Sequence, residues 1–452
     1  MAAIDINYTD LGIMIGIFVV TYVFIIKTSF DKTLASLLGA FTAIAVGSAR
    51  RIFDQTELLA EELSHDYLIL AIIFGNLLMV VVASEVGIFQ FISIKLLKAT
   101  QGDPNKIFWS FGVLTFVLSA FVNTIPAILI IGALTVVVCR ELNYDPKSYI
   151  LMEIVITNTG GLTTSISAIT NLIIAIPFAI GYLQFLLISL PLALVLFFVS
   201  MVSIKKLSPI PEAADLEWRL NKIQNFDEWS FIKDRRSFYL TSVVFVATLI
   251  TLLFSDAIGF EIGVIVIGGG IIMVYTSRKS IDIILQKIDW SLIAFFLSLF
   301  VLIKILEIVG LLQIISELLL KVLGQNNFLS AIIILISSSI LSGILDNIVL
   351  AISFTPVLLT IRTEKPGLNI GLMVWALIIG TNLGGGFTLI GAPPCVLGLG
   401  ILYRETGEKV GWGEFFKTVG VVTLLRIFVS IFYLFLLGFL DQALLCGAPC
   451  AP

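Results

Sequence analysis

Residues 157–161 read TNTGG and residues 381–385 read TNLGG, so the pattern TNxGG occurs twice with an offset of 224. Three other pairs keep an offset of 223: Asp66-Tyr67 with Asp289-Trp290, Val86-Gly87 with Val309-Gly310, and Asn123-Thr124 with Asp346-Asn347. An offset that holds within one residue over about 95 positions indicates an internal repeat.

The composition around these repeats is that of a membrane protein. The chain has 452 residues, of which 58% are hydrophobic and 13% are charged, and its mean hydropathy is +1.09. A soluble domain carries about 25% charged residues. Uncharged apolar runs of span length recur along the chain, which predicts a multi-pass α-helical membrane protein. This composition excludes a soluble enzyme, a nucleic-acid binder and a disordered scaffold.

The apolar runs predict ten transmembrane spans and two hairpins. We place the spans at 11–27, 33–49, 67–84, 148–175, 182–204, 238–254, 259–276, 290–306, 367–400 and 413–440. Segments 107–139 and 328–361 are too short for two full spans, which need about 40 residues, and both have polar residues in the middle. We therefore expect them to be re-entrant hairpins, whose irregular backbone is buried in protein or lines a wet cavity.

The charge distribution predicts the sidedness of these spans. One face receives 20 of the 27 Lys and Arg residues, and the positive-inside rule makes that face cytoplasmic, with both termini outside. An odd number of spans, five, separates the starts of the two repeats, so the repeats are inserted upside-down relative to each other. Inverted repeats with broken helices are typical of secondary transporters, whose site lies at the bilayer midplane.

Each TNxGG pattern is a candidate helix break. Paired glycines weaken a helix by about 1 kcal/mol each, and unwinding frees carbonyl and amide groups. Thr381, Asn382 and Thr388 can then help to bind an ion or a substrate, while the following half-helix presents its positive end. The prolines in residues 391–394, GAPP, strengthen the break. The alternative is close helix packing through small residues.

Asp346 is the only acidic residue deep in either hairpin segment. A charge at that depth is costly and marks function. Its carboxyl group could bind Na⁺ or carry a proton, which is the minimal chemistry of an exchanger, and the alternative is a neutral structural Asp. Asn123 stands at the equivalent position of the first repeat and cannot titrate. The roles of Arg426 and Glu153, which also lie within predicted spans, stay open.

Enzyme and cofactor motifs are missing from the sequence. It has no GxxxxGK[ST] and no HExxH, and His65 is the only histidine. Cys139, Cys395, Cys446 and Cys450 form no CxxC, so a structural zinc site lacks ligands. We expect no enzymatic activity, no cofactor other than a coupling ion (H⁺ or Na⁺) and no nucleic-acid partner.

Several longer motifs resemble the ion transporter superfamily. They are EVGIF (85–89), LTFVLSAFVNT (114–124), NTGGLTTSISAITN (158–171), LSGILDN (341–347) and NLGGGFTLIGAPP (382–394). The chain is most similar to the branch of arsenite permeases, NhaD-type sodium–proton antiporters, the melanosomal P protein and citrate-transporter-like domains, over roughly residues 10–440. It departs from that pattern at Asn123-Thr124, where antiporter-like members tend to have Asp-Asn, and at Cys395, where a related motif ends in Asn.

This resemblance implies a homodimer in which each protomer has a scaffold and a mobile transport domain that works as an elevator. The implied division is 1–66 scaffold spans, 67–204 first repeat, 205–237 cytoplasmic linker, 238–288 scaffold spans, 289–440 second repeat and 441–452 tail. By motif position the resemblance places ten residues at the ion and substrate site: Asn123, Thr124, Asn158, Gly160, Gly161, Asp346, Asn347, Asn382, Gly384 and Gly385. The candidate site also includes five threonines: Thr157, Thr163, Thr164, Thr381 and Thr388. A Na⁺ ion would bind at Asn123, Asn158, Asp346 and Asn382.

The expected function is secondary active transport in a prokaryotic plasma membrane. Proton-coupled antiport of a cation or a metalloid oxyanion, such as Na⁺ or arsenite, ranks first. Sodium- or proton-coupled transport of a di- or tricarboxylate such as citrate ranks second, because the Asn-Thr pair at 123–124 resembles the carboxylate-transporting branch. A passive channel or a membrane scaffold is the alternative of another class, although neither predicts inverted repeats with two broken helices.

Overall fold

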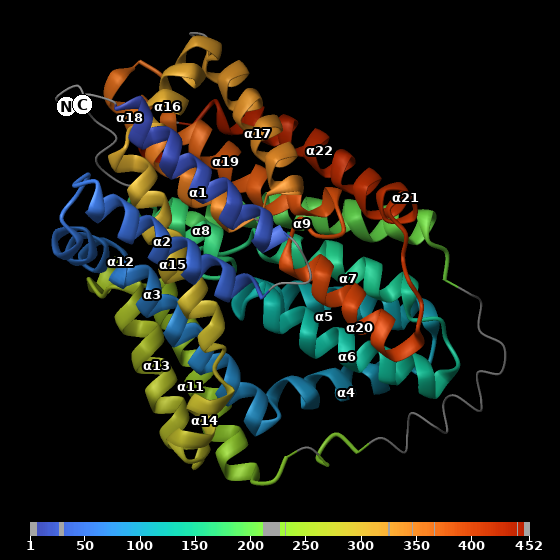
Figure 1. Ribbon diagram of the computed structural model, residues 1–452. Coiled ribbons are helices and arrows are strands. Elements are labelled where there is room, and N and C mark those ends of the chain that lie inside the picture. Colours follow the sequence, from blue (N-terminus) through green and yellow to red (C-terminus); the bar gives the residue numbers. More distant parts are fainter. Residues whose placement is uncertain are drawn as a thin grey trace.

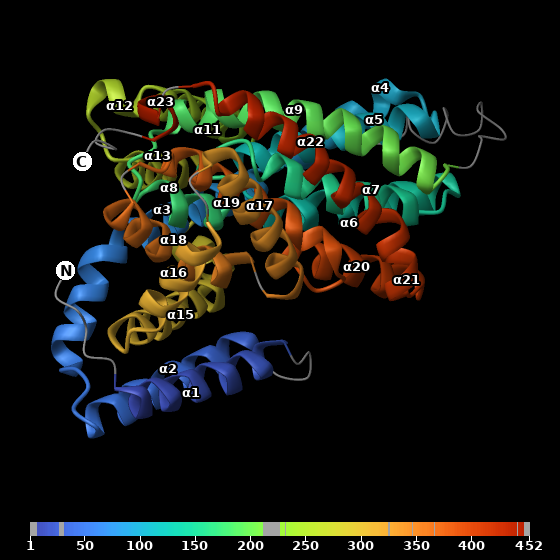
Figure 2. The same ribbon diagram turned by 90° about the horizontal axis from the view of Figure 1, so that it is seen from above.

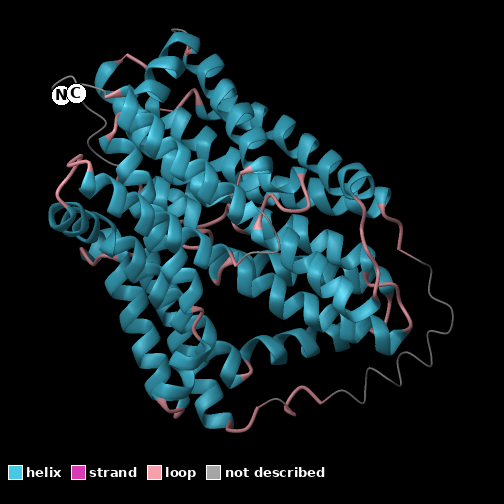
Figure 3. Ribbon diagram, viewed as in Figure 1, coloured by secondary structure: helices cyan, strands magenta, loops and turns pink. Residues whose placement is uncertain are grey.

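The computed structural model describes residues 7–26, 31–210, 227–230, 232–323, 326–345, 347–365, 367–440 and 442–446. Helices dominate this described part, which contains no β-strand (Figure 3). Eleven of its helical segments are long and apolar enough to cross a membrane. The prediction of an all-α, multi-pass membrane fold is therefore confirmed.

The helices follow the order of the predicted spans. The first half contains α1 (Tyr8–Ile26), α2 (Lys32–Ala49), α3 (Gln55–Val86), α4 (Ile88–Thr100), α5 (Pro104–Phe121), α6 (Thr124–Leu142), α7 (Lys147–Gly160), α8 (Ile169–Ala175) and α9 (Tyr182–Leu207). The second half contains α11 (Arg235–Leu253), α12 (Ser255–Ile258), α13 (Ile262–Ser277), α14 (Ile281–Lys287), α15 (Trp290–Ile308), α16 (Leu311–Val322), α17 (Asn327–Ile344), α18 (Asn347–Glu364), α19 (Ile370–Gly384), α20 (Pro393–Thr406), α21 (Trp412–Phe415), α22 (Val421–Leu437) and α23 (Gln442–Leu445).

The two repeats share their local structure as well as their sequence. Gly87 before α4 has φ 88° and Gly310 before α16 has φ 87°, and both values lie in the left-handed region that glycine adopts without strain. Asp103 caps the N-terminus of α5, and Asn326, 223 residues later, caps α17. The same turn and the same type of cap therefore define corresponding helices in both halves.

The repeats pack crosswise in space. α5, α6, α7 and α20 lie on one side of the molecule, with α3, α11 and α13 on the other (Figures 1 and 2). α13 packs on α3 and α2 packs on α15. Because α2 corresponds to α13 and α3 to α15 in the repeat, these are two equivalent pairs, each formed by one helix from each half. In the same way, α20 packs on α6 while α18 packs on α8. Each half thus completes the other half's core.

The two hairpins are longer than the apolar runs predict. The segment 107–139 corresponds to α5 and α6, which extend from Pro104 to Leu142, and 328–361 corresponds to α17 and α18, which extend from Asn327 to Glu364. Charged residues at the outer ends, such as Lys106 and Arg140, end the apolar run but not the helix. The turn of the first hairpin, at Val122-Asn123, lies against the broken segment that follows α7, because the Thr124 amide donates to Ser167 O at 3.3 Å.

Several short helices were not predicted. α4 and α16 have 13 and 12 residues, too few to span a bilayer, and each carries a lysine in its last turn. The predicted linker 205–237 lies partly outside the described residues, at 211–226 and 231. Trp229, in its described end, packs against the helices: the Trp229 ring centroid lies 4.8 Å from that of Phe91 and 5.9 Å from that of Phe238.

Candidate functional site

The first TNxGG pattern marks a break between α7 and α8. α7 ends at Gly160, residues 161–168 are irregular, and α8 resumes at Ile169. Side chains bind the freed carbonyl groups of this segment. Asn171 donates from Nδ2 to Gly161 O at 2.7 Å and to Thr164 O at 2.8 Å, and Ser167 Oγ also donates to Gly161 O. The break is therefore a fixed loop with buried polar groups.

The hairpin α5–α6 is bonded to this break. Ser119 Oγ on α5 donates to Thr157 O at 2.5 Å. Thr164 Oγ1 donates back to Ala120 O at 2.7 Å. These two bonds run in opposite directions between the hairpin and the broken helix, so they fix the position of one relative to the other.

The second break repeats these bonds. α19 ends at Gly384, a short 3₁₀ turn follows at 385–387, and α20 begins at Pro393. Ser342 Oγ on α17 donates to Thr381 O at 2.8 Å. Thr388 Oγ1 donates to Gly343 O at 2.6 Å. Ser342 and Thr388 lie 223 and 224 residues after Ser119 and Thr164, so the repeat preserves hydrogen bonds as well as sequence.

Asn171 and Asn382 join the two breaks directly. Asn382 donates from Nδ2 to Asn171 Oδ1 at 2.7 Å and to Ile378 O at 2.8 Å. Both side chains are buried. A buried amide–amide contact therefore joins α8 of the first repeat to α19 of the second.

Four glycines are required by close approaches at the breaks. A Cβ atom on Gly160 would lie 2.6 Å from Phe116 O, and one on Gly384 would lie 2.2 Å from Ser339 O, so these two glycines admit the hairpin helices. A Cβ atom on Gly161 would lie 2.6 Å from Thr124 Cγ2, and one on Gly385 would lie 2.5 Å from the Ala392 Cβ. The sequence analysis gave a helix break and close helix packing as alternative roles for these glycines. In the structure the glycine pairs have both roles.

The remaining predicted site residues lie around these breaks. Asn123 caps α6 by accepting from the Ile125 amide at 3.1 Å, and Thr124 is half-buried beside it. Within the described residues, the Asn158 Nδ2, Thr157 Oγ1 and Thr163 Oγ1 atoms are buried without a hydrogen-bond partner, and so is the Asn347 Oδ1. Asp346, the predicted coupling acid, lies outside the described residues.

Sequence reasoning missed the side chains that hold the breaks. Ser119, Ser342, Ser167 and Asn171 carry this role, and the repeat would have found two of them, because Ser119 and Ser342 are 223 residues apart, as Asn123 and Asp346 are. The offset of 224 that relates the TNxGG patterns pairs Asn171 with Cys395, whose Sγ lies 3.4 Å from Gly385 O. The carbonyl groups expected to coordinate an ion thus already accept bonds from side chains.

Glu153 lies outside this set. It is fully buried on α7 and accepts a hydrogen bond from Thr135 of α6 through Oε1. Its other carboxyl oxygen has no partner among the described residues.

Two neighbouring cavities reach the tip of the first hairpin. One, of about 270 Å³, is lined by Asn123 and by Glu85 and Lys287, which form an ion pair. The other, of about 540 Å³, is lined by Asp31 and Lys32. Both share lining residues at α6 and α15: Ile125, Leu129, Asp289 and Leu292. Their walls come from α2, α3 and α15 on one side and from α6, α17 and α20 on the other.

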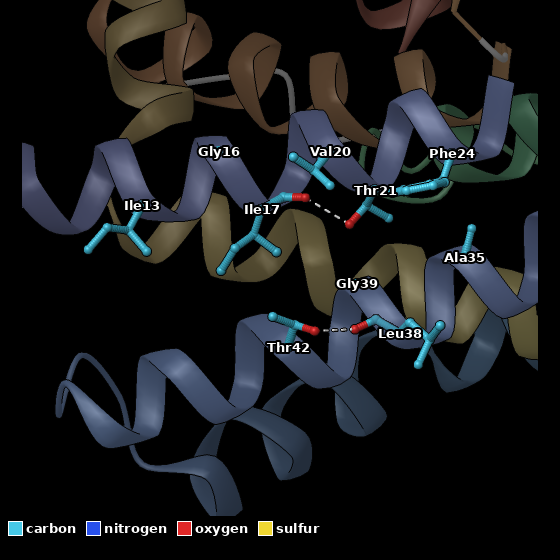
Figure 4. A pocket seen from close by; sticks show the side chains of 10 residues that line it. All are labelled: Ile13, Gly16, Ile17, Val20, Thr21, Phe24, Ala35, Leu38, Gly39 and Thr42. Carbon is cyan, nitrogen blue, oxygen red and sulfur yellow. Dashed lines mark hydrogen bonds between the residues drawn. The ribbon is translucent and has the colours of Figure 1, made fainter. Parts of the chain in front are cut away.

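A third cavity, of about 500 Å³, lies between α1 and α2 (Figure 4). Its lining is apolar apart from two threonines. Thr21 donates to Ile17 O and Thr42 donates to Leu38 O, so both hydroxyl groups bond within their own helices. This cavity therefore offers no free polar group to a substrate.

The fold and the paired breaks define a multi-pass transporter built from two repeats. The sequence profile of the family described as "Citrate transporter" (CitMHS) matches residues 22–380 and 261–445. The chain belongs to this CitMHS family, within the superfamily that the motifs resemble.

Relatives and a solved structure agree with this assignment. An uncharacterized transporter of Mycobacterium tuberculosis is 26% identical over 430 residues, which cover 94% of this chain and 98% of the relative. The P protein of Mus musculus is 27% identical over 496 residues, covering 91% of this chain and 58% of that protein. The crystal structure of the YdaH transporter of Alcanivorax borkumensis is similar in fold, with a TM-score of 0.59 at 14% identity, covering 89% of this chain and 91% of that one.

Proposed function

We propose that this protein moves a small anion across the membrane by secondary active, elevator-type transport. The observation that carries the proposal is the pair of equivalent hydrogen-bond sets at the two breaks, joined by Asn171 and Asn382. Broken helices from inverted repeats that meet in the middle of the bilayer form the substrate and ion sites of secondary transporters.

The packing supports a division into a moving and a static part. The hairpins, both broken helices, α9 and α22 bind one another crosswise and would move together as the transport domain. The scaffold would consist of α1, α2, α3, α11, α13 and α15. The cavities of about 540 and 270 Å³ lie along the boundary between these two groups, where a sliding motion needs few contacts.

The same cavities support access from the cytoplasmic side. Lys32 and Lys287 line them, and both belong to the face that the positive-inside rule assigns to the cytoplasm. A substrate could therefore reach Asn123 from inside the cell. In a homodimer with both termini outside, this arrangement would be the inward-facing state of each protomer.

A di- or tricarboxylate is the first candidate substrate. The family's description names citrate, and the described part of the site consists of amide, hydroxyl and backbone groups that can donate to carboxylate oxygens. Proton-coupled antiport of a cation or a metalloid oxyanion is the second candidate, because the sequence puts one acid, Asp346, into the second hairpin. In both cases Asp346 would bind the coupling ion, H⁺ or Na⁺.

A flux assay in proteoliposomes tests the proposal. We expect labelled citrate to accumulate when a proton or sodium gradient is imposed, and we expect Asp346→Asn to abolish the dependence on that gradient. Asp282→Asn, an exposed acid on α14, is the matched control and should transport normally. Arsenite and Na⁺ fluxes in the same vesicles test the second candidate.

Three outcomes would contradict the proposal. Currents far above carrier turnover would indicate a channel. Sealed vesicles without flux of any tested ion would indicate a scaffold. Intact gradient-driven flux in Asp346→Asn would remove Asp346 from the coupling step.

A further inference from the structure

α22 carries a row of buried polar residues, including an arginine without an acidic partner among the described residues. Thr423, Arg426 and Ser430 follow one another at helical spacing, and all three are 0% exposed. Thr423 Oγ1 donates to Val419 O, in the helical turn 416–420 that leads into α22, and Ser430 Oγ donates to Arg426 O, so both hydroxyl groups bond four residues back along the same helical segment. The three guanidinium nitrogens of Arg426 have no hydrogen-bond partner among the described residues.

Such a guanidinium group needs an acceptor. Burying a charge without a partner costs several kcal/mol, far more than burying an apolar side chain of the same length. The described residues contain no acidic side chain within 4.0 Å of Arg426. A purely structural role would pair this arginine with a carboxylate or with backbone carbonyl groups, and among the described residues it is paired with neither.

The position of Arg426 connects it to the second break. Thr423, one turn earlier on α22, is so close to the 3₁₀ turn that a Cβ atom on Gly386 would lie 2.4 Å from its Oγ1. The Arg426 guanidinium group also lies within electrostatic reach of the Cys395 thiol, in the first turn of α20. It therefore approaches the N-terminal end of α20, where the helix dipole adds positive potential.

A second buried donor lies at the same place. Asn158 belongs to the first repeat, but its side chain lies beside Cys395, within hydrogen-bonding reach of that thiol, and its Nδ2 has no other partner among the described residues. Both groups are donors, and within the described part of the chain neither has an oxygen acceptor. An anionic ligand with several oxygens would supply it.

We propose that Arg426, with Asn158 and the N-terminal end of α20, binds a carboxylate group of the transported anion. The inference rests on the proposed function and deepens it by assigning the residue that recognises the substrate's charge. A guanidinium group can donate two parallel bonds to one carboxylate, which a lysine cannot do.

The first half of the site has no such residue. The position 223 residues before Arg426 is Ser203, and Asn171 stands where the second half has Cys395. A substrate with several carboxylates would therefore bind in one orientation, with one carboxylate group at the second break.

Binding and stability measured on the same purified full-length protein test this inference. Arg426→Met removes the charge, Arg426→Lys keeps a point charge, and Arg404→Met, an exposed arginine on α20, is the control. We expect Arg426→Met to raise the Kd for citrate at least 30-fold, equivalent to about 2 kcal/mol. Arg426→Lys should raise it about tenfold, and the control should not change it.

The melting temperature separates recognition from a structural role. Without ligand, Arg426→Met should melt at the same temperature as the wild type or higher, because it removes a buried charge that has no partner within the described part of the chain. A lower melting temperature with unchanged citrate affinity would overturn the inference. If Arg426→Met cannot be purified, unchanged affinity in Arg426→Lys would overturn it equally.

Two further readouts distinguish this inference from the proposed function and from another anion. If the wild type transports citrate while Arg426→Met binds citrate with unchanged affinity, the proposed function is supported and the proposed role of Arg426 is wrong. If the wild type transports no anion at all, the proposed function itself fails. Sulfate that protects the protein as strongly as citrate would overturn the assignment to a carboxylate group.

Discussion

Asn382 donates from Nδ2 to Asn171 Oδ1 at 2.7 Å, across the boundary between the two repeats. Asn171 uses its own Nδ2 to hold Gly161 O and Thr164 O. One buried carboxamide therefore connects the first break to the second broken helix. Its removal tests how far the two breaks depend on each other.

We expect Asn171→Ala to destabilise the protein and to abolish transport. The substitution leaves two carbonyl groups and the Asn382 amide without this partner, and each unsatisfied buried group costs about 1–3 kcal/mol. The melting temperature in detergent and citrate flux in vesicles measure both effects. Asn105→Ala, an exposed asparagine on α5, should leave both unchanged. A wild-type melting temperature in Asn171→Ala would show that the connection carries no stability.

Gly384→Ala should displace the second hairpin. Its Cβ atom would lie 2.2 Å from Ser339 O, and a backbone atom cannot yield as a flexible side chain can. We expect a loss of about 1–3 kcal/mol, as for other overpacked sites, together with reduced transport.

Gly400→Ala is the matched control for Gly384→Ala, because no atom lies within 4 Å of the position its Cβ would take in the middle of α20. It should raise stability by up to about 1 kcal/mol through helix propensity. Equal melting temperatures in the two variants would contradict the close approach at Gly384.

Ser119→Ala and Ser342→Ala should have similar effects, since their hydroxyl groups make equivalent bonds to Thr157 O and Thr381 O. Each loss is worth about 0.5–1.5 kcal/mol. Ser337→Ala is the control, because that hydroxyl bonds within its own helix, to Ile334 O. A large loss of stability in only one of the two variants would show that the two equivalent bonds do not stabilise the protein equally.

The docked end of the linker should respond to acid. The hydrogen bond from Lys98 lowers the pKa of Glu228 below its ordinary value. A carboxyl group with a lowered pKa stabilises the folded protein above its unfolded pKa of about 4.3, and this contribution is lost as the pH falls through the folded value. The melting temperature should therefore fall less steeply with acid in Glu228→Gln than in the wild type. Identical pH profiles from pH 7 to pH 3.5 would contradict this expectation.

The sequence predicted the structural features that the internal repeat marks, above all the two helix breaks. The TNxGG patterns located both breaks because the offset preserves the residues that unwind the helices and admit the hairpins. The predicted first hairpin was too short because Lys106 and Arg140 end the apolar run. Helix α5 starts at its Asp103 cap, before the apolar run begins. α4 and α16 were missed because helices of 13 and 12 residues give no span signal.

The contacts that complete the site could not be predicted. Asn171 and Asn382 are 211 residues apart and lie in opposite repeats, so spacing along the chain says nothing about their distance. Arg426 lay within a predicted span, but only the three-dimensional structure reveals that its guanidinium group has no acidic partner among the described residues.

The crosswise packing of α20 on α6 and α18 on α8 bears on the origin of the fold. A polypeptide with one repeat would expose the apolar faces that the opposite repeat covers. An ancestral gene of half this length would have had to insert its product in both orientations and pair the opposed copies before duplication and fusion. Once fused, each half was free to diverge, and the exchange of asparagine for cysteine between positions 171 and 395 is one mark of that freedom.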